Sequence, residues 1–356
     1  MMTHRVHGVR TLIEGDYVET RGNLIFTVKG LIHPPNMAVA FLRYVPDPNG
    51  DRIRNGVKFR RIKSLKESFT EARRLCPNYV MEDPFFGRTI QAVPLRDAAV
   101  VYLPRQRLKA ILKEGASDRV EEAASKLALE LSDESGVPTD RMGVSGSTLL
   151  GLHRSNSDVD MTVYGVREGA EVYRALRGLV GRRGVSAHRG RLLEEACRFR
   201  WGSNPPIPFQ ALMRVEARKV LQGLVDGRGY FLRLVPEPWE FGERYGEAVY
   251  RRVGRCRIKA VVSDDSWAVY TPCLYRVEDV KVLWGVEAEV SELQSFRGRF
   301  TEQAWAGETV YAEGTLEAVY RDGEVFYRLV LEGGRDFMVP VWALKGSRSP
   351  EQPTPP

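Results

Sequence analysis

The chain has 356 residues, of which 43% are hydrophobic and 28% charged, a balance typical of a soluble globular protein with more than one domain. No apolar stretch approaches the roughly 20 residues of a membrane-spanning helix, and the first residues lack a signal-peptide core, so we expect a cytoplasmic protein without membrane contact. The net charge of +7 is modest for this length, and four cysteines without C-x-x-C spacing predict buried reduced thiols rather than a zinc site.

Residues 1–105 are predicted to form an α+β domain. Ser64 and Glu67 have the spacing of a capping box, which predicts a helix over 65–75. His33 lies in a turn before two prolines, where a structural role is expected. Strands are predicted from alternation and turn signals at 17–20, 24–31, 38–44, 57–63 (an edge strand) and 98–103.

Positive charge is concentrated at 51–75, where nine Lys or Arg residues face three acids. These residues either form a solvated face or follow a nucleic-acid backbone, with Phe59 or Tyr44 as the stacking surface. The basic residues concerned are Arg52, Arg54, Lys58, Arg60, Arg61 and Lys63.

The middle of the chain, 106–255, shows a regular alternation of elements. A helix over 105–113 is followed by a second helix, capped by Ser117 or Asp118, that ends near 135. Next come a short strand at 142–144, a turn with a short helix, a strand over 157–164 and a helix over 168–180. The order is therefore helix, strand, short helix, strand, helix.

Two features of this region indicate phosphate and metal chemistry. Gly146 and Ser147 follow the short strand, where glycine lets backbone amides approach an anion and the hydroxyl adds a donor. Asp158 and Asp160 lie two apart in a strand, so their side chains share one face. Adjacent carboxylates repel each other unless a cation lies between them, and such oxygen ligands suit Mg²⁺ or Mn²⁺ bound to substrate phosphates.

The pattern Gly146-Ser147, Gly151 and Ser157-Asp158-Val159-Asp160 resembles the signature of the DNA polymerase β-type nucleotidyltransferase superfamily. More loosely, the chain is similar to predicted archaeal nucleotidyltransferases of uncharacterised role. The resemblance implies a mixed-sheet nucleotidyltransferase-like core. It also implies that Gly146, Ser147 and Ser157 bind nucleotide, and that Asp158 and Asp160 hold the catalytic divalent metals.

The sequence departs from that signature in one respect. Members of the superfamily usually supply a third carboxylate from a later strand, but the strand expected at 229–235 carries Arg233 and no acid. Asp226 and Glu237 only flank it, and Asp264 and Asp265 lie on a later turn. A simpler interpretation of the motif is a Gly-Ser turn followed by surface aspartates.

A second basic block covers 182–220, again with nine Lys or Arg residues against three acids. It either grips a triphosphate or nucleic acid, because arginine suits phosphate, or it is a helix with a solvated face. His153 and His188 either neutralise phosphate or lie idle on the surface. The arginines concerned are Arg182, Arg183, Arg189, Arg191, Arg198 and Arg200.

The last part of the chain changes to short strands and turns. Residues 256–345 are predicted to form a small β-barrel-like domain, with Asp322-Gly323 as a hairpin turn. This domain either binds RNA or DNA or is a structural or dimerising module. The tail 346–356 is expected to be disordered. Strands are predicted at 258–262, 268–270, 280–290, 309–320, 325–331 and 337–341.

The sequence therefore predicts an α+β protein that transfers a nucleoside monophosphate from a nucleoside triphosphate to an acceptor hydroxyl, with Mg²⁺ or Mn²⁺ as cofactor and RNA or DNA as the first expected acceptor. The alternative is a catalytically inactive nucleic-acid-binding protein on the same core. The sequence gives no indication of the oligomeric state.

Overall fold

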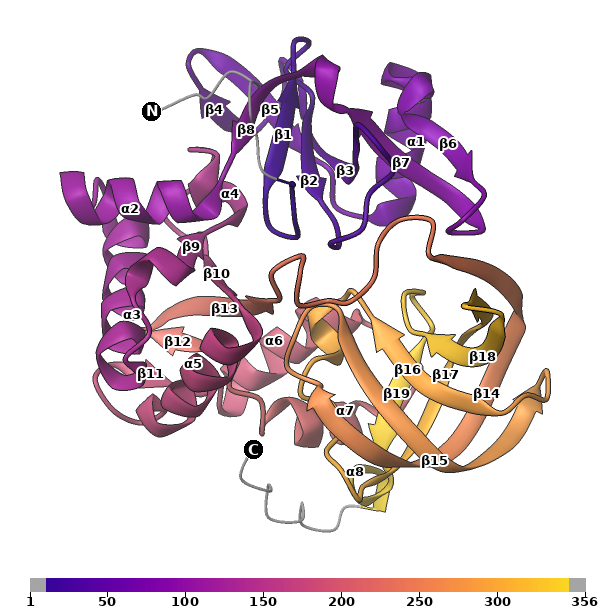
Figure 1. The fold of residues 1–356 in the computed structure, drawn as a ribbon. Coiled ribbons are helices and arrows are strands. Elements are labelled where there is room, and N and C mark those ends of the chain that lie inside the picture. The colour runs from indigo at the N-terminus through magenta and orange to yellow at the C-terminus, as the bar shows by residue number, and fades with distance from the viewer. Residues whose placement is uncertain (1–10, 346–356) are drawn as a thin grey trace. The chain divides into compact units, whose positions relative to one another are not determined.

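The structure, a computed structural model, describes residues 11–345 and has a mixed α+β architecture with three sheets (Figure 1). The chain divides into two compact units. The first contains the residues up to Val172 together with Val225–Glu247, and the second contains Tyr173–Leu224 and the residues from Ala248 onward. The predicted tail at 346–356 lies outside the described residues.

An eight-stranded, curled sheet occupies the N-terminal part of the first unit, in the order β4-β5-β3-β2-β1-β8 with β7 and β6 continuing from β3. Because β4 lies outside β5, the predicted edge strand at 57–63 is an inner one. The elements are β1 (Tyr17–Thr20), β2 (Ile25–Val28), β3 (Met37–Pro46), β4 (Arg52–Arg54), β5 (Val57–Arg61), α1 (Leu65–Leu75), β6 (Val80–Asp83), β7 (Arg88–Pro94) and β8 (Ala98–Tyr102), with 3-10 helices at Pro77–Tyr79 and Leu95–Asp97.

Strand β1 of this sheet is buried on both faces. Successive residues of β1 point to opposite sides, so Val18 packs with the apolar residues near α1, whereas Tyr17 belongs to a second cluster. The second cluster includes Leu150 and Leu152 from the centre of the chain. The predicted helix at 65–75 is confirmed, and Ser64 Oγ accepts the Glu67 amide at 3.1 Å.

His33 is a structural side chain of this sheet, as expected. Its Nε2 lies 2.7 Å from the Leu12 carbonyl and its Nδ1 accepts the Val39 amide at 3.1 Å, which fits a neutral ring with its proton on Nε2. Burial lowers the pKa of His33 to about 4. Protonation of Nδ1 would remove the bond from Val39.

We expect the free energy of unfolding of the first unit to keep its full contribution from neutral His33 above pH 6.5. It should fall as the pH drops from 6.5 through about 4. The pKa of His33 is lower in the folded than in the unfolded chain, so the unfolded chain binds more protons in that pH window. The resulting loss of unfolding free energy is up to about 3 kcal/mol. Denaturant unfolding at several pH values tests this. His33→Asn, which keeps an acceptor for Val39, should be less stable at neutral pH but should depend less on pH. Equal pH dependence in both proteins would contradict the assignment.

The remainder of the first unit carries a three-stranded arrangement with β10 between β9 and β13. β10 is antiparallel to β9 and parallel to β13. The predicted order of helix, strand, short helix, strand, helix is confirmed. The elements are α2 (Pro104–Glu114), α3 (Arg119–Ser135), a 3-10 helix at Thr139–Arg141, β9 (Met142–Val144), α4 (Gly146–Leu149), β10 (Val159–Tyr164), α5 (Val166–Leu179), which continues into the second unit, and β13 (Arg228–Val235).

The second unit contains a ring of strands with helices against it. β14, β15, β16, β18 and β17 pair in that order, the β14–β17 pairing closes the ring, and β19 adds to β17 (orange to yellow in Figure 1). Its elements are β11 (Val185–Ser186), α6 (Gly190–Trp201), α7 (Phe209–Glu216), β12 (Gln222–Val225), β14 (Ala248–Trp267), β15 (Cys273–Gly285), β16 (Val290–Ser295), a 3-10 helix at Gly298–Phe300, β17 (Thr309–Arg321), β18 (Glu324–Val330), β19 (Phe337–Pro340) and α8 (Val341–Lys345).

Two strand predictions in this part were wrong. Residues 268 and 269 form a turn after β14 and Tyr270 forms only a single β-bridge, although all three are buried as a strand would be. The predicted strand at 280–290 combines the end of β15 with a loop, and β16 begins only at its last residue. A buried apolar run does not distinguish a strand from a buried turn, because both remove the same side chains from water.

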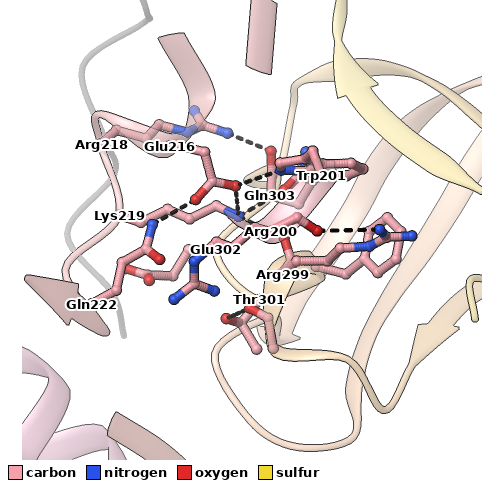
Figure 2. Close-up of polar contacts among 12 residues, drawn as sticks. Arg200, Trp201, Glu216, Arg218, Lys219, Gln222, Arg299, Thr301, Glu302 and Gln303 are labelled. Atoms are coloured by element: carbon pink, nitrogen blue, oxygen red, sulfur yellow. Dashed lines mark hydrogen bonds and ion pairs between the residues drawn. The ribbon is translucent and has the colours of Figure 1, made fainter. Parts of the chain in front are cut away.

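A buried polar cluster joins the helices to the ring inside the second unit (Figure 2). Lys219 Nζ donates to Glu216 Oε1 at 2.9 Å, to Gln303 Oε1 at 2.9 Å and to the Arg299 carbonyl at 2.6 Å. Trp201 Nε1 donates to the same Glu216 oxygen at 3.1 Å. Lys219 and Glu216 side chains are each 1% exposed. All three amine donors therefore have partners in the interior.

The four cysteines, Cys76, Cys197, Cys256 and Cys273, are free thiols, as predicted, and all but Cys76 are buried. Among residues 11–345, no helix has the length and apolar character needed to cross a membrane.

Candidate active site

The turn after β9 is held by backbone and side-chain bonds. Ser145 donates its amide to the Asp160 carbonyl at 2.8 Å and its hydroxyl to the Gly15 carbonyl at 2.8 Å. Gly146 then adopts φ +62°, in the left-handed region that favours glycine. A Cβ at Gly146 would lie 2.1 Å from Asp160 Oδ2, so the missing side chain is what leaves room for that carboxylate.

The two aspartates lie where β10 begins. Asp158 is exposed immediately before the strand, and Asp160 is half-buried as its second residue. Asp158 lies just outside the strand, so the shared face expected from strand alternation stays a prediction for this pair. Asp160 is opposite Phe231 of β13, and a Cβ built on Gly229 would lie 2.5 Å from Asp158 Oδ1. Each carboxylate therefore lies against a glycine.

The acids that the sequence offered as a third carboxylate are engaged elsewhere. Asp226 pairs with Lys126 at 2.7 Å, and Glu237 is paired with Arg105. Within residues 11–345, no group of three or more His, Cys, Asp or Glu side chains could hold a metal ion.

Arg233 lies opposite Thr162 in the parallel pairing, two residues beyond Asp160. Its Nε is 3.6 Å from Glu14 Oε1, and that buried carboxylate also accepts from Lys29 at 2.6 Å. Arg233 is thus paired with the N-terminal segment. Burial alone would raise the pKa of Glu14, but the charges of Lys29 and Arg233 lower it, so Glu14 is ionised and compensated.

The N-terminal sheet borders this site, a relationship that the sequence did not reveal. Burial raises the pKa of the Tyr17 phenol, and the charge of Asp160 raises it further, which indicates that the two are within electrostatic reach. Gly15 is also close, because a Cβ there would lie 3.0 Å from Thr162 Cγ2. No sequence motif indicates that residues 14–17 lie near this site, because contacts between segments far apart in the chain place them there.

Two of the basic residues of 51–75, Arg52 and Arg54, serve this packing. Arg52 donates to the Leu152 carbonyl at 2.7 Å, and Arg54 donates to the Leu150 carbonyl at 3.3 Å and to Glu19 at 2.6 Å. The stacking surface predicted from Phe59 or Tyr44 is wrong. Both rings are at most 2% exposed, because the apolar cluster over the loop at 149–152 needs them.

Ser157 and His153 have local structural contacts. Ser157 Oγ accepts the Arg154 amide at 2.9 Å, and Arg228 donates to the Ser157 carbonyl at 2.8 Å. His153 Nε2 lies 2.6 Å from Asp118 Oδ2, at the residue that caps α3. These bonds fix the loop that leads into Asp158.

Part of the second basic block lies on helix α6 of the second unit. On α6, Arg191 pairs with Glu195 at 2.8 Å and Arg198 with Glu194 at 2.7 Å, both with i, i+4 spacing. This is the arrangement of a solvated helical face. Burial lowers the pKa of His188 below its ordinary value, and the charge of Arg200 acts in the same direction.

The uncharacterized protein MJ1086 of Methanocaldococcus jannaschii is similar to this chain. The two are 30% identical over 331 residues, which cover 90% of this chain and 95% of the relative. No protein-family model matches the chain, and no solved structure matches it.

Proposed function

The chain belongs to the family of this archaeal protein, and we propose that it is a metal-dependent nucleotidyltransferase. The observation that carries the proposal is the pair Asp158 and Asp160, two positions apart at the start of β10, each against a glycine that leaves it room. In the proposed reaction an acceptor hydroxyl attacks the α-phosphorus of a nucleoside triphosphate and pyrophosphate leaves. Gly146, Ser147 and Ser157 are the proposed nucleotide contacts, and RNA or DNA is the proposed acceptor.

The donor set fits a divalent cation that arrives with its nucleotide. Mg²⁺ is usually held by one or two carboxylates together with substrate phosphates and water, rather than by an all-protein cage. Asp158 and Asp160 supply two hard oxygen ligands of this kind, and Mn²⁺ accepts the same ligands. Such a cation would neutralise phosphate charge in the site. The protein's own contribution is to hold the nucleotide in position.

A second candidate is a catalytically inactive nucleic-acid-binding protein on the same core. It is favoured by the lack, among the described residues, of a third acidic side chain beside the two aspartates. A site with two carboxylates can bind a metal–nucleotide complex without supporting the two-metal clamp used in many phosphoryl transfers. The two candidates therefore differ in turnover rather than in nucleotide binding.

We expect saturable binding of a nucleoside triphosphate in the presence of Mn²⁺, measured by calorimetry, and a loss of at least about tenfold in Asp158→Asn/Asp160→Asn. The double variant keeps the size of both side chains and removes their charges. Asp133→Asn/Asp140→Asn is the matched control, because it removes two exposed carboxylates from the same unit. The control should bind as the wild type does.

Transfer is then measured by incubating the wild type with labelled nucleoside triphosphate, Mn²⁺ and an oligonucleotide that has a free 3′ hydroxyl. Label that appears in the oligonucleotide, and is absent with the Asp158→Asn/Asp160→Asn protein, supports the enzyme. Nucleotide binding without transfer favours the second candidate. Equal nucleotide binding by the wild type and the double variant, or none by either, contradicts the proposed site.

A further inference from the structure

The ring of the second unit has the connectivity of an OB-fold. Its first three strands, β14, β15 and β16, are successive antiparallel neighbours, β16 pairs with β18 in parallel, and β17 closes the ring by pairing with β14. Fold-level likeness alone assigns no function. The residues that carry the inference lie on the outer face of the three adjacent strands β17, β14 and β15.

The registers of these strands define two neighbouring rows on that face. In one row Lys259 of β14 has Tyr311 of β17 on one side and Lys281 of β15 on the other. In the next row Arg257 lies between Glu313 and Trp284, and the pairing of β14 with β15 shifts register between the two rows. Residues opposite each other point to the same side of a sheet, as do Arg257 and Lys259 two positions apart. We call these residues the basic–aromatic face: Arg257, Lys259, Lys281, Trp284 and Tyr311.

Two features of the basic–aromatic face are unfavourable for a surface that only meets water. Lys259 and Lys281 are like charges directly opposite each other, an arrangement that destabilises a strand pair, and neither forms an ion pair with another described residue. Trp284 is 56% exposed beside them. By contrast, Arg257 is compensated by Glu313 at 2.7 Å. The free charge therefore lies on the lysine pair next to an open indole ring.

We propose that the basic–aromatic face binds single-stranded nucleic acid. The two lysines attract phosphates, and Trp284 offers a flat ring on which a base can stack. Stacking tolerates any base, so the face should bind with little sequence preference. A duplex shares the phosphates, but its bases are already stacked on each other and cannot cover the indole. This proposal does not depend on the site at Asp158.

The test is fluorescence anisotropy with a labelled single-stranded 20-nucleotide RNA of mixed sequence, titrated with the full chain at several salt concentrations. In Lys259→Gln/Lys281→Gln we expect weaker binding and a log–log salt slope shallower by about 1.4, because two phosphate contacts are lost. In Trp284→Ala we expect binding about 5- to 150-fold weaker with the slope unchanged. A blunt duplex of the same sequence should bind more weakly than the single strand.

Lys109→Gln/Lys113→Gln is the matched control, because it removes the same charge from two exposed lysines of α2 in the first unit. It should bind RNA as the wild type does. An equal loss in this control and in the β14–β15 variant would overturn the proposal. An absence of saturable RNA binding at low salt would also overturn the proposal. An acidic protein would then be the expected partner of the basic–aromatic face. Lys259→Gln/Lys281→Gln should keep Mn²⁺–nucleotide binding, whereas Asp158→Asn/Asp160→Asn should lose it, so failures of the two proposals are distinguishable.

Discussion

Lys219→Met is expected to destabilise the second unit by about 3–5 kcal/mol, the range measured when one partner of a buried ion pair is removed. Methionine fills the space of the lysine stem but donates no hydrogen bond. Glu216, Gln303 and the Arg299 carbonyl each lose a donor in the interior, at 2.9, 2.9 and 2.6 Å respectively (Figure 2). The substitution therefore removes hydrogen bonds and a compensating charge, and it keeps the packing.

The charge left behind makes this substitution severe. Burial would raise the pKa of Glu216, but the charges of Lys219 and Arg200 together with the hydrogen bonds from Lys219 and Trp201 lower it, so the carboxylate is ionised. Without Lys219 the buried carboxylate must lose its charge or the structure must open. Glu216→Gln/Lys219→Met removes both charges, so the double variant should be more stable than the single lysine variant.

Hydrogen exchange followed by mass spectrometry is the appropriate measurement, because a chain with two units need not unfold in a single transition. Peptides from α7 and from the ring should exchange faster in Lys219→Met, while peptides from the N-terminal sheet serve as an internal reference. Arg191→Met is the control: its side chain is 91% exposed in an i, i+4 pair, and the change should be within about 0.5 kcal/mol. Unchanged exchange in Lys219→Met would contradict the structural role given to the cluster.

The elements that the sequence predicted well are those controlled by local chemistry. The capping pair Ser64 and Glu67 and the Asp118 cap of α3, one of the two caps that the sequence offered, depend on residues close together in the chain. Local hydrogen bonds and alternation act the same way wherever the segment lies. Hence the order of elements around the motif could be predicted.

What the sequence could not predict depends on contacts between distant segments. No residue near Arg54 in the sequence indicates that it donates to the Leu150 carbonyl, 96 positions later. The basic residues of 51–75 could therefore be interpreted as a nucleic-acid surface. The buried rings of Phe59 and Tyr44 were mistaken for the same reason. Likewise, the pairing of Arg233 with Glu14 follows from the packing of the N-terminal segment on the β10 face.

Gly146→Ala is expected to abolish most Mn²⁺–nucleotide binding, with a loss of at least about tenfold, while lowering stability by only about 1–2 kcal/mol. The stability cost arises because φ is +62° at this position. The larger effect is steric. A Cβ there would lie 2.1 Å from Asp160 Oδ2 and 2.8 Å from its Cγ, so the carboxylate must rotate away from its place.

Gly136→Ala separates the backbone cost of a positive φ from the collision with the Asp160 carboxylate. Gly136 follows α3 with φ +71°, and a Cβ there meets nothing within 4 Å. It therefore carries the same backbone cost without touching a carboxylate. We expect the larger fall in stability in Gly146→Ala, which adds the collision to the same backbone cost, and a loss of nucleotide binding only in that variant, measured by the same calorimetric titration.

A double-mutant cycle with Asp160→Ala tests the steric argument without relying on nucleotide binding. If the added methyl group collides with the carboxylate, Gly146→Ala should cost less stability when Asp160 is already alanine, because only the backbone term is left. Equal costs in both backgrounds would mean that the collision is relieved without moving Asp160. Gly146 and Asp160 would then be independent, and the glycine would have no role in leaving room for the carboxylate. The co-occurrence of the Gly146-Ser147 turn with the two aspartates would lose its physical explanation.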